Sequence, residues 1–140
     1  MVYINTMIMR TLTTVILFLT LAITANGQTK NDMREFDPHF AHTVFFWFKN
    51  PDNQEDRAAF EKSLQKFLDN SAYAKTSFIG KPPKASRDVV DGSFTYSLIV
   101  TFESAEAQQK YQDEAPHKVF IEESSHLWAK VIVYDSMGVQ

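Results

Sequence analysis

The segment His42–Lys49 reads HTVFFWFK, and this stretch decides the fold. Its aromatic and β-branched residues favour a β-strand, in which successive side chains point to opposite faces. One face then carries His42 together with three apolar side chains, Val44, Phe46 and Phe48. The other face carries Phe45 and Trp47. Because both faces are apolar, the sheet that contains this strand needs a cover on each side.

The rest of the domain predicts helices and strands in a regular order. Apolar residues recur with helical spacing over Gln54–Asn70, behind a possible cap at Asp52 or Asn53. Strands are expected over Tyr73–Gly80, Phe94–Phe102 and Trp128–Asp135, and helices after Ser104 and over His117–His126, with Pro116 as an interruption between them. The order β-α-β-β-α-(α)-β predicts an α+β subunit of the ferredoxin-like kind.

The later strands also bear on how the sheet is covered. Period two puts five residues of Phe94–Phe102 on one face: Phe94, Tyr96, Leu98, Val100 and Phe102. The closing strand is apolar on both faces, like the first. Two helices cover only one face of a four-stranded sheet, and a second copy of the sheet is the simplest cover for the other. The pattern therefore predicts a homodimer; loops folded over the sheet are the alternative.

The first 27 residues differ from the rest of the chain. Arg10 is their only charged residue, and Leu12–Ile23 is an apolar run followed by the small residues Ala25 and Gly27. A basic start, a short apolar core and a small-x-small exit are typical of a secretory signal peptide, and the run is shorter than a membrane span. We expect a signal peptide over 1–27, a polar tether over 28–38 and a domain over 39–137, exported to the periplasm or outside the cell. An uncleaved anchor is the alternative.

Composition excludes several classes of function. The chain has 140 residues, 14 Lys and Arg against 17 Asp and Glu, and a formal net charge of -3. Nucleic-acid binding needs a basic face, so no nucleic-acid partner is expected. There is no cysteine, which removes disulfides, thiol catalysis and thiolate metal sites. Once the signal is removed, no stable membrane span is expected.

Four histidines are candidate acids or bases near neutral pH: His39, His42, His117 and His126. Each has an ordinary structural interpretation, as a buried hydrogen-bonded ring or a solvated turn residue. Tyr111 lies six positions before His117 and reads equally as a core aromatic. Glu122 and His126 are helical i, i+4 neighbours, which favours an exposed pair over a metal site. No nucleotide, phosphate or nucleophile-elbow motif occurs.

Four segments resemble one known family. HTVFFWFK at the start, Thr95–Ser104, Pro116–Phe120 and Trp128–Asp135 together are similar to the stress-responsive dimeric α/β-barrel family, in order and in spacing. The resemblance implies a ferredoxin-like subunit that dimerises sheet to sheet into a barrel. One enzyme of the family, a plant polyketide cyclase, works by aldol condensation without a cofactor.

The resemblance also implies a site. That cyclase has a histidine at the start of its first strand and a tyrosine six residues before a second histidine, positions that match His42, Tyr111 and His117. In such a pocket His117 is a general base, Tyr111 donates a hydrogen bond to a developing oxyanion, and His42 orients or relays. The ligand-binding walls expected around these residues are apolar: Val44, Phe46, Phe48 and Phe120. Neither a cofactor nor a metal is expected.

The chain departs from the family pattern at one point, because Glu114 stands where the family often has a histidine and the proline is shifted by one position. The substrate of the plant cyclase is not expected here, because an exported protein would not meet a product made in the cytosol. The expectation is an exported dimer that binds a small, partly apolar molecule, with cyclase-, lyase- or isomerase-like chemistry. A non-catalytic stress-related binding module and a haem- or metal-binding barrel are the alternatives.

Overall fold

The structure is a computed structural model that describes residues 36–139. The predicted signal peptide over 1–27 and most of the predicted tether over 28–38 lie outside these residues. Within the described part, no helix has the length and apolar character needed to cross a membrane.

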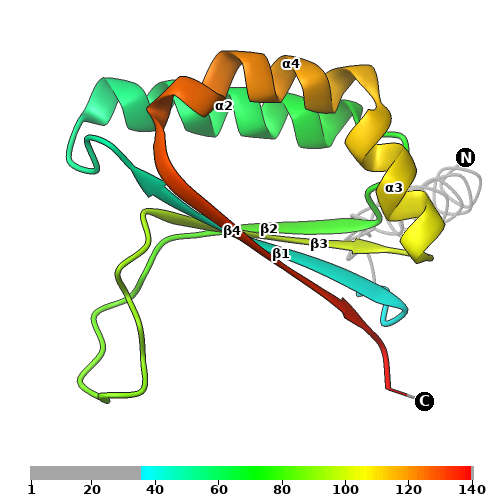
Figure 1. Ribbon diagram of the computed structural model, residues 1–140, viewed down its shortest axis with the longest axis horizontal. Coiled ribbons are helices and arrows are strands. Elements are labelled where there is room, and N and C mark those ends of the chain that lie inside the picture. Colours follow the sequence, from blue (N-terminus) through cyan, green and yellow to red (C-terminus); the bar gives the residue numbers. More distant parts are fainter. Residues whose placement is uncertain (1–35, 140) are drawn as a thin grey trace, which may run out of the picture. The chain divides into compact units, whose positions relative to one another are not determined.

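The fold is the predicted ferredoxin-like α+β arrangement. Its elements are β1 (Phe40–Phe48), α2 (Gln54–Asn70), β2 (Thr76–Gly80), β3 (Tyr96–Phe102), α3 (Ala105–Asp113), α4 (Ala115–Ser124), a 3-10 turn (Ser125–Leu127) and β4 (Trp128–Met137). The four strands form one antiparallel sheet in the order β2-β3-β1-β4. Helices α2 and α4 lie side by side over one face of this sheet, and α3 lies toward one end (Figure 1).

The helix α2 has the predicted bounds because its start is well specified. The side chain of Asn53 accepts hydrogen bonds from the backbone N–H groups of Glu55 and Asp56, which satisfies two free donors of the first turn. Its apolar stripe then brings Phe60, Leu64 and Phe67 into the core, each with 2% exposure or less. That burial contributes most of the stability of a helix in a small domain.

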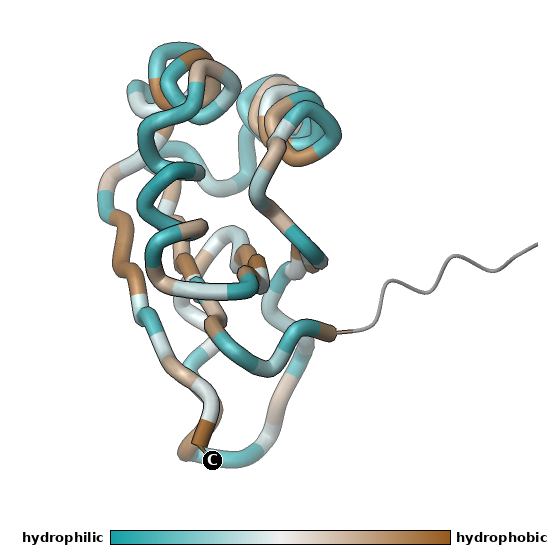
Figure 2. Tube along the Cα trace, turned by 90° about the vertical axis from the view of Figure 1, so that its right-hand side faces the viewer, coloured by the Kyte–Doolittle hydropathy of each residue, from teal (hydrophilic) through white to brown (hydrophobic). Residues whose placement is uncertain are grey.

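The two faces of β1 have different surroundings, in the alternating pattern expected of it. Residues from Phe40 to Phe48 alternate between buried and half-buried, and the buried set faces the helices. The hydropathy view shows the helices on one side of the sheet only (Figure 2).

The sheet face away from the helices carries a group of apolar side chains. Phe45 packs against Trp47, Phe94 and Tyr134, with ring centroids 6.4, 5.0 and 6.3 Å apart. Tyr134 and Phe78 are each 59% exposed. We call this the open face; within one subunit it is only partly covered.

The period-two pattern predicted that Phe94 and Tyr96 share a face of the sheet. This prediction is wrong, because Phe94 lies on the open face with Phe45. The strand begins at Tyr96, because the backbone N–H of Thr95 donates to the carbonyl of Phe46 and the Thr95 hydroxyl accepts from the N–H of Phe48. These bonds turn the chain just before the strand, and the ring of Phe94 packs on Phe45 on the open face.

Several boundaries also differ from the predictions by a few residues, and two of the differences have a local cause. Pro116 lies in the first turn of α4, which begins at Ala115 and not at His117, since proline is tolerated where the N–H has no helical partner. Strand β2 begins at Thr76 and not at Tyr73, because the hydroxyl of Ser71 accepts hydrogen bonds from the N–H groups of Tyr73 and Ala74 in a turn.

Candidate functional site

A cavity of about 150 Å³ lies between the helices and the sheet. Three polar rings from three different elements line it: His42 of β1, Tyr111 of α3 and His117 of α4. The ring centroids of His42 and Tyr111 are 6.0 Å apart, and those of Tyr111 and His117 are 5.5 Å apart. The structure therefore brings the three candidate residues together on one side of the sheet.

The apolar wall of the cavity contains most of the side chains predicted for it. Val44, Phe46 and Phe120 line it, and the remaining apolar lining comes from Phe67, Leu98, Ile121, Trp128, Val131 and Val133. Phe48 is not part of the lining. Its ring packs on Phe60 and Tyr96, with centroids 5.0 and 5.4 Å away, at the filled end of the same layer.

His42 is held by a carboxylate that the sequence reasoning missed. Its Nδ1 lies 2.6 Å from Oδ1 of Asp135, and the β1–β4 register places these two residues directly opposite each other. A carboxylate accepts, so Nδ1 carries a hydrogen and donates it; in the neutral form of the ring the lone pair is then on Nε2. Asp135 lies 93 positions away in the chain, and only the register of the edge strand pairs it with His42.

His117 is held in the same tautomer by a backbone group. Its Nδ1 is 2.9 Å from the carbonyl oxygen of Gln112, which only accepts, so Nδ1 donates and Nε2 is the basic nitrogen. That carbonyl is available because α3 ends at Asp113, which leaves it among the last four carbonyls of the helix, and because Pro116, four residues on, has no N–H. Burial lowers the pKa of His117 from its usual value, and the hydrogen bond to Gln112 offsets part of this effect.

Tyr111 supplies a hydrogen-bond donor to the cavity. The residue is 1% exposed, and no hydrogen bond of its hydroxyl is found within residues 36–139. Burial raises the pKa of this hydroxyl far above its usual value, and the nearby Glu114 carboxylate acts in the same direction. Tyr111 therefore stays protonated and can donate to a ligand oxygen.

Trp128 is a second lining residue that the sequence reasoning did not select. Its indole N–H is buried and has no hydrogen-bond partner among residues 36–139. Its position at the start of β4 did not mark it as a site residue, because an aromatic residue at the start of a strand is usually part of the core.

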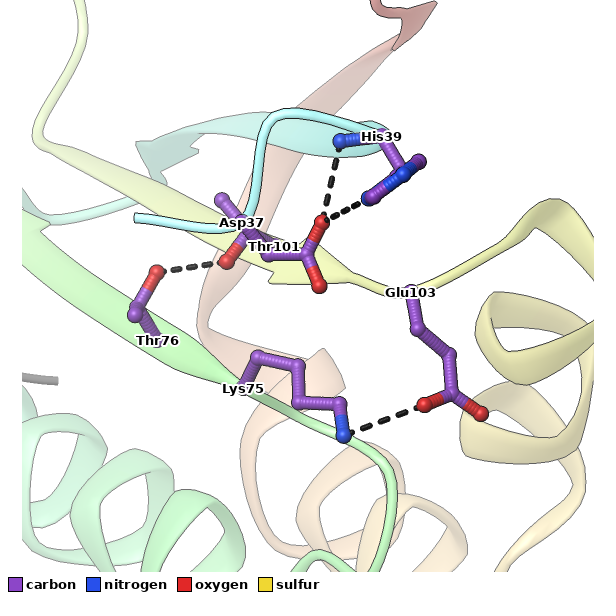
Figure 3. Close-up of polar contacts among 6 residues, drawn as sticks. All are labelled: Asp37, His39, Lys75, Thr76, Thr101 and Glu103. Atoms are coloured by element: carbon purple, nitrogen blue, oxygen red, sulfur yellow. Dashed lines mark hydrogen bonds and ion pairs between the residues drawn. The ribbon is translucent and has the colours of Figure 1, made fainter. Parts of the chain in front are cut away.

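The other two histidines lie outside the cavity lining. His39 is exposed, and the carboxylate of Asp37 accepts from both its backbone N–H and its Nδ1, at 3.0 and 2.7 Å (Figure 3). His126 is exposed, and its carbonyl accepts from the ammonium group of Lys49. No group of three or more His, Cys, Asp or Glu side chains in the described part of the chain is arranged to hold a metal ion.

Solved structures with this fold come from plants and bacteria. A hypothetical protein from Arabidopsis thaliana is 23% identical, with 72% of this chain and 96% of that chain aligned and a TM-score of 0.61. A hydroxynitrile lyase from Passiflora edulis is 20% identical over 71% of this chain and 94% of that chain, with a TM-score of 0.61. A dimeric ferredoxin-like protein of unknown function from Thermobifida fusca is 13% identical over 74% and 94%, with a TM-score of 0.59. At these identities the likeness shows the fold alone.

No curated protein matches the chain in sequence. A family model does: that of the stress responsive A/B barrel domain matches residues 40–137, the stretch from the first residue of β1 to the last of β4. The chain therefore belongs to the stress responsive A/B barrel domain family.

Proposed function

We propose that this protein binds a small molecule with a carbonyl or hydroxyl group in the cavity and moves a proton on it without a cofactor. The observation that carries the proposal is the hydrogen bond from His117 Nδ1 to the Gln112 carbonyl, which leaves Nε2 as a base beside the cavity. The lowered pKa of His117 supports it further, because the ring is then neutral and able to accept a proton near pH 7.

The proposed step needs only groups of this chain. His117 Nε2 takes a proton from the carbon next to a carbonyl, and the carbonyl oxygen becomes an enolate oxygen. Tyr111 donates its hydroxyl hydrogen bond to that oxygen, and His117 then returns the proton. His42, fixed by Asp135, orients the ligand with its Nε2. A hydroxynitrile lyase shares the fold, which is compatible with acid–base chemistry on such a scaffold.

Hydrogen–deuterium exchange of a simple ketone tests the proposal. Methyl ethyl ketone is incubated with the protein in D2O, and the loss of its α-proton signals is followed by NMR. We expect exchange faster than in buffer, and a decrease of about 10²-fold or more for His117→Gln, because a positioned base contributes that much. His39→Gln is the matched control, since His39 is an exposed histidine outside the cavity lining.

The outcomes separate the proposed catalyst from the binding module. Binding of the ketone without accelerated exchange, in the parent protein as in His117→Gln, would identify a non-catalytic binding protein. Accelerated exchange that survives His117→Gln would show that the base lies elsewhere.

We propose further that a second copy covers the open face. The half-buried Phe45 and Trp47 and the exposed Tyr134 and Phe78 leave apolar surface there, and the Thermobifida fusca neighbour is described as dimeric. Trp47→Asp should convert the dimer to monomers in sedimentation, because it buries a charge between two sheets. Val119→Asp, a change on the outside of α4, should leave the dimer intact.

We propose export as well, from the signal-like residues 1–27. The intact mass of protein isolated from its native host measures this directly. A chain that begins near Gln28 supports it, and a chain that retains the first 27 residues contradicts it.

A further inference from the structure

The cavity opens to the surface between α4 and the edge strand β4. Three aliphatic side chains of its lining are partly exposed: Ile121 at 37%, Val131 at 37% and Val133 at 46%. The register puts both valines on the side of β4 that faces the helices, opposite Phe46 and Val44 of β1. We call these three residues the α4–β4 mouth; Figure 1 shows the two elements that form it.

The mouth and the interior differ in chemistry. His42 and Tyr111, at 4% and 1% exposure, are buried, whereas the mouth is aliphatic and meets solvent. The cavity is also small, since pockets that bury a drug-sized ligand usually measure ~300–1,000 Å³. A ligand larger than about 150 Å³ does not fit inside the cavity alone and must extend through the mouth.

None of the lining side chains in the described part of the chain is a lysine or an arginine. An anionic ligand would lose its hydration without gaining a formal counter-charge, which disfavours it. The carboxylate of Asp135, bound to His42, repels anions in addition. The ligand that suits this lining is uncharged.

We infer that the cavity takes a neutral, elongated molecule with its polar end against Tyr111 and His117 and its apolar tail in the α4–β4 mouth. This inference rests on the proposed function, because the polar end is the group on which His117 acts. The mouth then sets specificity for the length of the tail, separately from the chemistry at the rings.

A groove of about 270 Å³ between α2 and α4 is the competing route. It shares Phe67 and Phe120 with the cavity, but these two rings stack with centroids 5.5 Å apart and separate the two spaces. Both are buried, at 2% and 3% exposure. Val119, 38% exposed, lines this groove and does not line the cavity. A ligand can enter the cavity through the mouth without displacing either of these rings.

Two substitutions on α4 form a matched test. Ile121→Glu changes the mouth and Val119→Glu changes the groove. The two side chains are 37% and 38% exposed, and glutamate is well tolerated in helices. The affinities of methyl ethyl ketone and methyl hexyl ketone are measured by NMR titration. In the parent protein each CH2 that leaves water should tighten binding ~2- to 4-fold, so the longer ketone binds more tightly.

We expect Ile121→Glu to weaken the binding of methyl hexyl ketone about tenfold or more. The affinity of methyl ethyl ketone should change by less than about twofold. Val119→Glu should leave both ketones within about twofold. Equal affinity of the two ketones in the parent protein, or a loss with Val119→Glu in place of Ile121→Glu, overturns the inference and leaves the proposed function standing. Failure of both ketones to bind the parent protein overturns the two together.

Discussion

Two buried tyrosines lie at opposite ends of the layer between helices and sheet, and their surroundings differ. Tyr96, at 0% exposure, donates its hydroxyl hydrogen bond to Glu61, and the cations of Arg57 and Lys81 lie 5.4 and 5.2 Å from its ring centroid. Tyr111, at 1% exposure, lines the cavity, and its hydroxyl has no acceptor among residues 36–139. One end of the layer is filled and satisfied, and the other is hollow with unused donors.

Residue type and burial are the same for the two tyrosines, so only the hydrogen-bond partner distinguishes Tyr96, a structural residue, from Tyr111, a candidate site residue. The Tyr111 hydroxyl is not among the fully buried polar atoms that lack a partner, and its residue lines the cavity, so it is placed to donate into that space. The core rings pack tightly at the Tyr96 end, where the ring centroid of Phe60 lies within 5.1 Å of those of Phe46, Phe48 and Tyr96.

The largest expected effect concerns packing at the two ends. Phe60→Ala should lower the free energy of unfolding by ~3–5 kcal/mol, because its ring is fully buried and surrounded by other rings. Phe67→Ala, seven residues along the same helix, should cost at least about 1 kcal/mol less, because one side of that ring borders an existing cavity. Urea unfolding of both variants measures the difference, and equal losses would contradict the contrast in packing.

A smaller effect is expected from removing each hydroxyl. Tyr96→Phe should lower the free energy of unfolding by about 1 kcal/mol. The effect is small for a hydrogen bond to a charged group, because Glu61 is partly exposed and water replaces the lost donor. Tyr111→Phe should leave stability within about 0.5 kcal/mol, since no protein bond is lost. Thermal unfolding of the two variants decides it; a Tyr111→Phe loss as large as that of Tyr96→Phe would show a protein partner for the Tyr111 hydroxyl.

The smallest effect is a pH dependence at the hollow end. Burial lowers the pKa of His117 in the folded state, so the unfolded chain binds a proton first as the pH falls. The free energy of unfolding should therefore decrease between about pH 7 and about pH 5, and His117→Gln should make that decrease smaller. Urea midpoints of both proteins at the two pH values give the comparison. An identical decrease in the variant would assign it to other groups.

Much of the fold could be predicted because local rules specify it. The alternation in β1 and the cap at Asn53 depend only on neighbouring residues, and both hold in the structure. The ferredoxin-like architecture followed from the order of helices and strands along the chain, and the structure has it. His42, Tyr111 and His117 were selected through the resemblance to the family, since each also had an ordinary structural interpretation.

The rest depended on contacts between distant parts of the chain. Asp135 reaches His42 only through the register of β1 and β4, which one sequence does not specify. Phe48 has the periodicity of a cavity residue, but Phe60 and Tyr96 fill the space around it. Phe94 follows the same period as Tyr96, yet a bond made by Thr95 turns it to the open face. Periodicity gives the face of an element; neighbours across the fold decide what fills the space beside it.

The acceptor that fixes the ring of His117 is a main-chain carbonyl, and this has a consequence for mutational tolerance. A substitution at position 112 keeps that acceptor, so it should have little effect on the orientation of the His117 ring. Position 116 is different: Pro116→Ala would supply an N–H that competes for the Gln112 carbonyl and would release the ring. The orientation of a candidate base is thus encoded one residue before it, by an imino acid that does not line the cavity.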